Sequence, residues 1–351
     1  FILVNDGQVE LLVDHVEGED IVCVCANDGI VKNKRGINVP GIKLGFDYLS
    51  EKDIADITFG CEQGVNFIAA SFVRRAQDVL DVKKLLIENG HPEIQIIAKI
   101  ENSEGVENMD EILKVADGIM VARGDLGVEV PAEDVPLIQK EIIKKCRAVG
   151  KVVITATQML DSMQENPRPT RAEVSDVANA IFDGTDAIML SGESAQGKYP
   201  EEAVMTMTKI ALKTEETLDY DALLRKAIRT APEDPSEAIC MSVAEIASKF
   251  SVAAIIVYTE SGSTAKRVSR YRPESMVIAA TPYEPVTRSL ALNWGVKGVV
   301  CKQMRDRVAQ IEYAQILAKE NGVEPGEQIL ITAGTPGVGG TTSYLELITV
   351  K

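Results

Sequence analysis

Between residues 50 and 200 the chain alternates short, continuous apolar runs with longer amphipathic segments of helical period. The runs are FIAASF (67–72), IQIIAKI (94–100), GIMVA (118–122), VVITAT (152–157) and AIML (187–190). Strands that are apolar on both faces and separated by helices are typical of a parallel sheet covered by helices. The pattern therefore predicts an α/β domain over residues 38–217.

The pattern differs on either side of this stretch. Residues 1–37 have short strand-like runs broken by turn sequences such as NDG and EGED, which predicts a small β unit. Beyond residue 217 a helical run, SEAICMSVAEIASKF, precedes apolar runs that predict further strands. These lie near 252–258, 276–281, 297–301, 328–333 and 345–350. Residues 218–351 are therefore expected to form a second α/β domain.

Each of the five apolar runs between residues 38 and 217 is followed by polar side chains. In chain order these are Ser71 with Arg74, Lys99 with Glu101, Arg123 with Asp125, Thr157 with Gln158, and Ser191 with Glu193. A β/α barrel gathers such groups at the C-terminal face of its strands, whereas a doubly wound sheet focuses them at one switch point. The even distribution favours a TIM-type (β/α)8 barrel. Five strands cannot close eight, so this interpretation requires three strands that the chain as given lacks.

Charge and cysteine usage exclude several classes of function. The net charge of −16 argues against a nucleic-acid surface and against binding to anionic membranes. No apolar run approaches the eighteen residues that a membrane span needs. Six scattered cysteines without a C-x-x-C motif predict reduced thiols rather than a zinc site or a disulfide framework, which fits a cytoplasmic protein.

The run IIAKIENSE (96–104) places Lys99 and Glu101 on one face of an apolar strand. Glu101 and Asp125, at the ends of neighbouring strands, can present two carboxylates to one point, which suits Mg²⁺. Lys99 would then stabilise charge that develops on a transferred phosphoryl group or an enolate. The alternative is a structural ion pair between Lys99 and Glu101.

Two neighbouring positions can contribute to an anion site. Gly124 precedes a possible helical turn whose backbone N–H groups can bind a carboxylate or a phosphate, although the glycine can equally serve a turn. The Thr157 hydroxyl can donate to a bound carboxylate or pass on a proton. Equally, it can form a hydrogen bond to its own backbone.

Polar groups also gather at two other strand ends. Ser191 and Glu193 share a face and are candidates to support the site from behind. In the last domain, hydroxyls and a glycine lie between a strand and a helix, which suits a phosphate at a helix N-terminus, or simply a capped helix. The residues of this loop are Thr259, Ser261, Gly262, Ser263 and Thr264.

These motifs, taken in order, resemble pyruvate kinases. The resemblance is carried by GVNFIAASFVR, AKIEN, IMVARGDLGVE, TATQMLDSM and NPRPTRAEVSDVANAIFDGTDAIMLSGESA, and it runs essentially from end to end of the chain. It implies transfer of the phosphoryl group of phosphoenolpyruvate to ADP, which gives pyruvate and ATP in glycolysis. It also implies a homotetramer and a requirement for Mg²⁺ (or Mn²⁺) and K⁺.

The resemblance also implies roles for individual residues. Lys99 corresponds to the lysine that stabilises the transition state, and Glu101 and Asp125 to the divalent-metal ligands. Gly124, Asp125 and Thr157 correspond to positions that hold the substrate carboxylate, with Thr157 also near the path of proton delivery. Ser191 and Glu193 match a segment whose role is less settled.

Other parts of the family pattern are only partly present. The stretch before INVPG, which includes Asp6, resembles a lid domain that closes over the nucleotide. The family's first barrel strands, part of the lid and the K⁺ ligands do not appear in this chain, so the chain alone is expected to be inactive. TESGSTA and TPGVGGTT resemble loops that hold a sugar-phosphate activator in regulated members.

Two other functions remain open from the sequence. One is another Mg²⁺-dependent barrel enzyme that acts on pyruvate or its enolate, such as an aldolase, which would explain Lys99, Glu101 and Asp125 without a nucleotide. The other is a non-catalytic fragment whose last domain binds a metabolite or another subunit.

Overall fold

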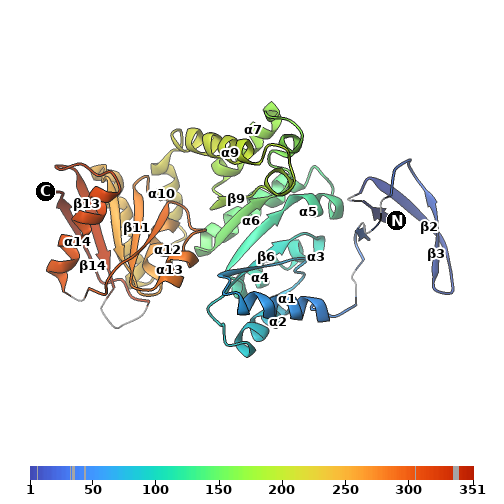
Figure 1. The fold of residues 1–351 in the computed structure, drawn as a ribbon, viewed down its shortest axis with the longest axis horizontal. Helices are drawn as coiled ribbons and strands as arrows, with labels where there is room; N and C mark the ends of the chain where they lie inside the picture. Colours follow the sequence, from blue (N-terminus) through green and yellow to red (C-terminus); the bar gives the residue numbers. More distant parts are fainter. Residues whose placement is uncertain (6, 32, 34–35, 43–44, 305, 335–339) are drawn as a thin grey trace. The chain divides into compact units, whose positions relative to one another are not determined.

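The computed structural model describes residues 1–351 except 6, 32, 34–35, 43–44, 305 and 335–339 (Figure 1). The described chain divides into two compact units. The first comprises Phe1–Cys146 and Val153–Glu215, and the second comprises Arg147–Val152 and Glu216–Lys351.

The first unit begins with a small antiparallel sheet, as the strand-like N-terminal pattern predicts. Its strands are β1 (Ile2–Val4), β2 (Val9–Glu17), β3 (Asp20–Cys25) and β4 (Ile37–Asn38), in the order β3-β2-β1-β4. The hairpin between β2 and β3 turns at Gly18, whose φ of +65° is readily adopted by glycine. Figure 1 draws this hairpin in blue near the N-terminus.

The rest of the first unit is built on a parallel sheet whose strands were all predicted from their apolar runs. They are β5 (Phe67–Ala70), β6 (Gln95–Ile100), β7 (Gly118–Ala122), β8 (Val152–Ala156) and β9 (Ala187–Ile188). The spatial order β5-β6-β7-β8-β9 follows the chain without reversal. A doubly wound sheet would reverse at a switch point, so the consecutive order is that of a barrel wall.

Helices separate these strands and bury one face of the sheet. They are α1 (Glu51–Glu62), α2 (Ala76–Glu88), α3 (Ser103–Glu107), α4 (Met109–Val115), α5 (Arg123–Glu129), α6 (Val135–Val149), η1 (Asp161–Gln164), α7 (Arg171–Asp183), α8 (Gly192–Ala195) and α9 (Pro200–Glu215). A capping box starts α7, since Thr170 and Glu173 exchange hydrogen bonds between side chain and backbone.

The two faces of β6 have different surroundings, and this difference positions the polar residues. Ile96, Ala98 and Ile100 lie in the apolar core shared with the helices. Ile97 and Lys99 alternate with them and therefore point to the opposite face, which in a barrel wall is the interior. The strand thus directs Lys99 away from the helices.

The second unit is an α/β domain, as predicted, with a five-stranded sheet of order β12-β11-β10-β13-β14. Its strands are β10 (Ala254–Tyr258), β11 (Met276–Thr281), β12 (Val296–Val300), β13 (Gln328–Ala333) and the antiparallel edge strand β14 (Tyr344–Thr349). Its helices are α10 (Tyr220–Ile228), α11 (Pro235–Phe250), α12 (Ser263–Arg270), α13 (Glu284–Ser289) and α14 (Arg307–Glu320). Apolar clusters cover both faces of this sheet.

No helix in the described ranges is long and apolar enough to cross a membrane.

Candidate active site

Lys99 and Glu101 form an ion pair at the end of β6. Lys99 Nζ lies 2.8 Å from Glu101 Oε1 and donates to Ser71 Oγ at 2.9 Å, at the end of the neighbouring strand β5. The Glu101 side chain is 1% exposed and the Lys99 side chain is 23% exposed. Lys99 and Glu101 therefore form the ion pair that the sequence offered as the alternative to a catalytic role. Lys99 is the more exposed of the two residues.

The buried Glu101 carboxylate has a second donor on its other oxygen. The backbone N–H of Phe72 donates to Glu101 Oε2, and Phe72 has a left-handed φ of +52°. Burial raises the pKa of Glu101, against the opposing effects of Lys99 and of the Phe72 amide. The negative charge of Asp125 raises the pKa of Glu101 further, so the two carboxylates interact electrostatically across β6 and β7.

Asp125, the second residue after Arg123 in the first turn of α5, is half-buried. Among the described residues, no hydrogen bond or ion pair engages its carboxylate, in contrast to Glu101. Within the same part of the chain, no group of three or more His, Cys, Asp or Glu side chains is placed to hold a metal ion. The donor set is thus two interacting carboxylates, which fits Mg²⁺ because that ion usually takes one or two carboxylates and completes its shell with water and substrate oxygens.

The structure brings the two predicted anion-binding positions together. The Gly124 N–H donates to Thr157 Oγ1 at 2.7 Å, and Thr157 Oγ1 donates to the carbonyl of Ala156 at 2.6 Å. The sequence suggested two roles for this hydroxyl, and the structure shows the second, a hydrogen bond to the local backbone. To bind here, a substrate carboxylate would have to replace Thr157 Oγ1 as the acceptor of the Gly124 N–H.

The backbone after β8 turns through two consecutive left-handed residues, Thr157 (φ +69°) and Gln158 (φ +53°). This conformation is rare for residues other than glycine and strained for a β-branched one such as threonine. Each such residue costs roughly 1–3 kcal/mol and persists only where the surroundings hold it, often at functional sites. We refer to Ala156–Met159 as the β8 corner.

Glu193 supports the chain just beyond this corner. Its carboxylate, 1% exposed, accepts the backbone N–H of Leu160 at 3.0 Å and that of Ser191 at 2.8 Å. It therefore ties the segment after β8 to the segment after β9. The sequence placed Ser191 and Glu193 at a strand end, and the structure shows the contacts by which Glu193 joins two such ends.

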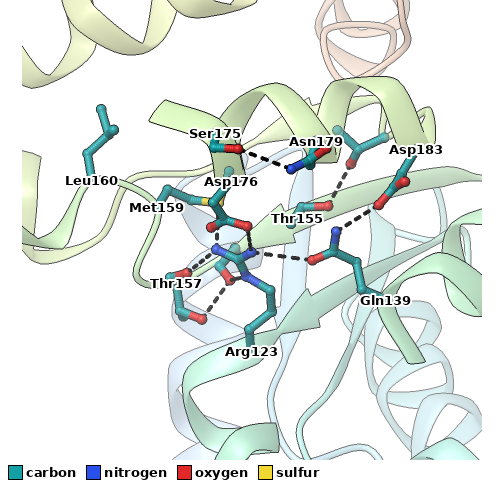
Figure 2. A network of polar contacts seen from close by, with 12 residues as sticks. Arg123, Gln139, Thr155, Thr157, Met159, Leu160, Ser175, Asp176, Asn179 and Asp183 are labelled. Carbon is teal, nitrogen blue, oxygen red and sulfur yellow. Dashed lines mark hydrogen bonds and ion pairs between the residues drawn. The ribbon is translucent and has the colours of Figure 1, made fainter. Parts of the chain in front are cut away.

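Two contributions to the site have no clear signal in the sequence. The Phe72 amide donates to Glu101 from a residue in the left-handed conformation, although no glycine or asparagine marks that turn. Arg123, which follows β7, donates to the carbonyls of Ala156 and Thr157 rather than facing solvent (Figure 2).

The predicted phosphate loop of the second unit is ordered by its own hydroxyls. Thr259 Oγ1 accepts the N–H of Gly262 at 2.9 Å, and Thr264 Oγ1 lies 2.9 Å from Thr342 Oγ1. Ser261 and Ser263 share a hydrogen bond of 3.1 Å and are the more exposed hydroxyls. Gly340 and Thr341, from the predicted TPGVGGTT loop, join them around a cavity of about 70 Å³, while residues 335–339 of that loop lie outside the described residues.

Comparison with known proteins identifies the family. A family model described as "Pyruvate kinase, barrel domain" matches residues 1–204, and one described as "Pyruvate kinase, alpha/beta domain" matches residues 237–348. The chain belongs to the pyruvate kinase family.

Individual members of the pyruvate kinase family are similar over the whole chain. The "Pyruvate kinase" of Clostridium perfringens is 53% identical over 350 residues, covering 99% of this chain and 74% of its own length. That of Clostridium acetobutylicum is 50% identical, covering 100% and 74%, and that of Geobacillus stearothermophilus is 53% identical, covering 99% and 60%. The family resemblance inferred from the motifs is thereby confirmed, and another Mg²⁺-dependent barrel enzyme is not supported.

Proposed function

We propose that the protein transfers the phosphoryl group of phosphoenolpyruvate to ADP, giving pyruvate and ATP in glycolysis. The observation that carries the proposal is the placement of Lys99, Glu101 and Asp125 at the ends of the adjacent strands β6 and β7, in a chain of the pyruvate kinase family. Phosphoryl transfer depends mainly on positioning and charge stabilisation, and these three groups are suited to both.

Each of the three charged groups has a separate role in this proposal. Glu101 and Asp125 hold Mg²⁺ (or Mn²⁺), which when bound neutralises charge on the substrate oxygens. Lys99 stabilises the negative charge that develops during transfer and on the enolate that remains. Its contacts with Glu101 and Ser71 hold its ammonium group at the strand ends, so little reorganisation is needed there.

The substrate carboxylate is proposed to bind between the first turn of α5 and the β8 corner. Gly124 and Asp125 supply backbone N–H groups, and Thr157 supplies its hydroxyl, which also lies near the path of the proton to the enolate. Support comes from the 2.7 Å bond between Gly124 N–H and Thr157 Oγ1, which places the two groups within reach of one ligand. Ser191 and Glu193 are proposed to hold the corner from behind.

The remaining features of the proposal rest on the family alone. They are a homotetramer, a K⁺ requirement whose ligands are expected outside this chain, and a location in the cytoplasm. The division into residues 1–37, a catalytic domain over 38–217 and a regulatory domain over 218–351 is proposed from the pattern of apolar runs together with the family. The assignment of residues 1–37 to a lid rests on the family, and Asp6 lies outside the described residues. Six free cysteines are in keeping with a reducing compartment.

The reaction is tested by following ADP-dependent formation of pyruvate from phosphoenolpyruvate. Pyruvate formation without ADP would indicate a different barrel enzyme.

A polypeptide of residues 1–351 alone is expected to be inactive. Among the described residues β5 forms one edge of the parallel sheet, and a cavity of about 760 Å³ lies beside it. Activity in that polypeptide would contradict this expectation. If the polypeptide is inactive, and adding the segment of a longer relative that this chain does not match restores activity, a non-catalytic fragment is excluded.

Substitution of Gly124 by alanine is expected to weaken phosphoenolpyruvate binding without loss of stability. The added methyl group would lie 3.5 Å from Thr157 Cβ and Oγ1, an ordinary contact, but it would stand where the substrate carboxylate is proposed to bind. We expect KM for phosphoenolpyruvate to rise about ten-fold with Tm unchanged or slightly higher, since alanine favours the helix. Gly127→Ala on the same helix is the matched control, and equal KM values in the two variants would contradict the carboxylate site.

The loop Thr259–Thr264 is proposed to bind a phosphate of a sugar-phosphate activator through Ser261, Ser263 and the first turn of α12. A sugar bisphosphate is expected to lower the apparent KM for phosphoenolpyruvate and to raise Tm. Ser261→Asp should abolish both effects by repelling the phosphate, whereas Ser242→Asp on α11 should leave them intact. If a sugar bisphosphate changes neither quantity in the unmodified protein, the proposal is wrong.

A further inference from the structure

The Arg123 side chain is buried, and all its donors are used. Its side chain is 11% exposed. Nε donates to the carbonyl of Ala156 at 3.2 Å, and Nη2 donates to the carbonyl of Thr157 at 2.8 Å and contacts Met159 Sδ at 2.8 Å. Nη1 makes two further contacts, described below. A guanidinium has five N–H groups in a fixed planar fork, and each one here has an acceptor.

Three of these five acceptors belong to the β8 corner, the short segment that contains both left-handed residues. Figure 2 shows the guanidinium lying against Thr157 and Met159. The corner contains no glycine, so its conformation is not favoured locally and has to be held by contacts from outside. Donation to two successive carbonyls, those of Ala156 and Thr157, fixes the orientation of the two peptide groups on either side of Thr157.

The other side of the guanidinium is anchored to two helices. Nη1 lies 2.7 Å from Asp176 Oδ1 on α7 and donates to Gln139 Oε1 on α6 at 3.3 Å. Gln139 in turn donates to Asp183 at 3.1 Å, so its amide is itself held in place. The position of Arg123 is therefore set by helix contacts that are independent of the corner.

We propose that Arg123 is a positioning residue for substrate binding, which acts by holding the β8 corner so that Thr157 and Gly124 can share the carboxylate of the substrate. This inference rests on the proposed function. Arg123 does not itself contact the substrate. Lysine cannot replace it, because an ammonium group is a point charge that cannot donate to two carbonyls in one plane while it also reaches Asp176.

The test compares Arg123→Lys with Ile142→Val in the full protein. Ile142 is a buried residue of α6 in an apolar cluster that includes no residue of the β8 corner, so its truncation is expected to lower stability without disturbing Thr157. In Arg123→Lys we expect KM for phosphoenolpyruvate to rise about 10- to 100-fold, with KM for ADP unchanged. The control should leave both KM values within about two-fold. Unchanged KM for phosphoenolpyruvate in Arg123→Lys, with only a lower Tm, would overturn the inference.

A double-mutant cycle with Thr157→Ala shows whether Arg123 acts through the corner. If it does, Arg123→Lys should raise KM for phosphoenolpyruvate much less in the Thr157→Ala background, and additive effects would overturn the inference.

If Arg123→Lys does not fold, Asp176→Asn weakens the same anchor with little change in volume. It should reduce the rise in Tm that phosphoenolpyruvate produces, and an undiminished rise would count against the inference. Failure of the unmodified protein to form ATP would refute the proposed function instead.

Discussion

Replacing Lys99 by methionine is expected to reduce kcat for pyruvate formation by about 10³-fold, the scale of losing one preorganised stabiliser of transition-state charge. Methionine keeps most of the volume of the lysine stem and removes the ammonium group. The Lys99 side chain is partly exposed at the strand ends, where its charge can face the transferred phosphoryl group. The measurement is steady-state turnover at saturating phosphoenolpyruvate, ADP and Mg²⁺.

The structure also defines the cost of this change to stability. Loss of Lys99 leaves the buried Glu101 carboxylate with only the Phe72 N–H, and an unpaired buried charge can cost about 3–5 kcal/mol. A lower Tm is therefore expected, and it must be measured separately from turnover. Lys84→Met, which breaks an exposed pair with Glu88 on α2, is the matched control and should change neither quantity. Near-normal turnover in Lys99→Met would overturn the assigned role.

The apolar runs predicted the strands because a strand buried on both faces has a continuous hydrophobic signature that does not depend on distant contacts. β7 and β11 occur over the predicted ranges, and β6 differs by one residue. Strand-end polar groups could also be predicted, since their direction follows from alternation along a strand. The alternation around Lys99 therefore predicted the position of the candidate site at the strand ends.

The contacts of those groups could not be predicted in the same way. The turn at Thr157 and Gln158 is left-handed without glycine, so the local sequence contains no sign of it. Arg123 reaches partners 33, 36 and 53 residues away, on the β8 corner and on α7. Such contacts depend on how helices pack around the sheet. The sequence therefore predicted the charged groups of the candidate site and a supporting role for Glu193, but not the long-range contacts that Arg123 makes.

The contacts change the expected relation between Gly124 and Thr157. From the sequence, the Gly124 N–H and the Thr157 hydroxyl were separate candidates for the substrate carboxylate. In the structure the two groups form a hydrogen bond with each other. Arg123 donates to the Thr157 carbonyl, and Glu193 accepts the N–H of Leu160 just beyond the corner, so both residues support the same segment. A change in any supporting contact should therefore affect phosphoenolpyruvate more than ADP.

Neutralising the carboxylate of Asp125 is expected to raise the Mg²⁺ concentration needed for half-maximal activity by at least about ten-fold, because changes around metal ligands typically cost 10- to 100-fold in affinity. Asp125→Asn keeps the shape of the side chain. Within the described residues its carboxylate has no protein partner, so the substitution breaks no ion pair. Its effect on Tm without metal should be small. The measurements are Mg²⁺ titration of activity and direct binding of Mn²⁺ by electron paramagnetic resonance.

Glu101→Gln separates metal binding from structural pairing, because this carboxylate is the one that Lys99 contacts at 2.8 Å. The amide keeps an oxygen that can accept the Phe72 N–H, and Lys99 keeps Ser71, so the fold is expected to survive. If Glu101 is a ligand, Mn²⁺ binding should weaken as in Asp125→Asn, while Glu88→Gln on α2 should leave it unchanged. An unchanged metal dependence with a lower Tm would instead make Lys99 and Glu101 a structural pair. Asp125 would then be the only protein carboxylate assigned to the ion.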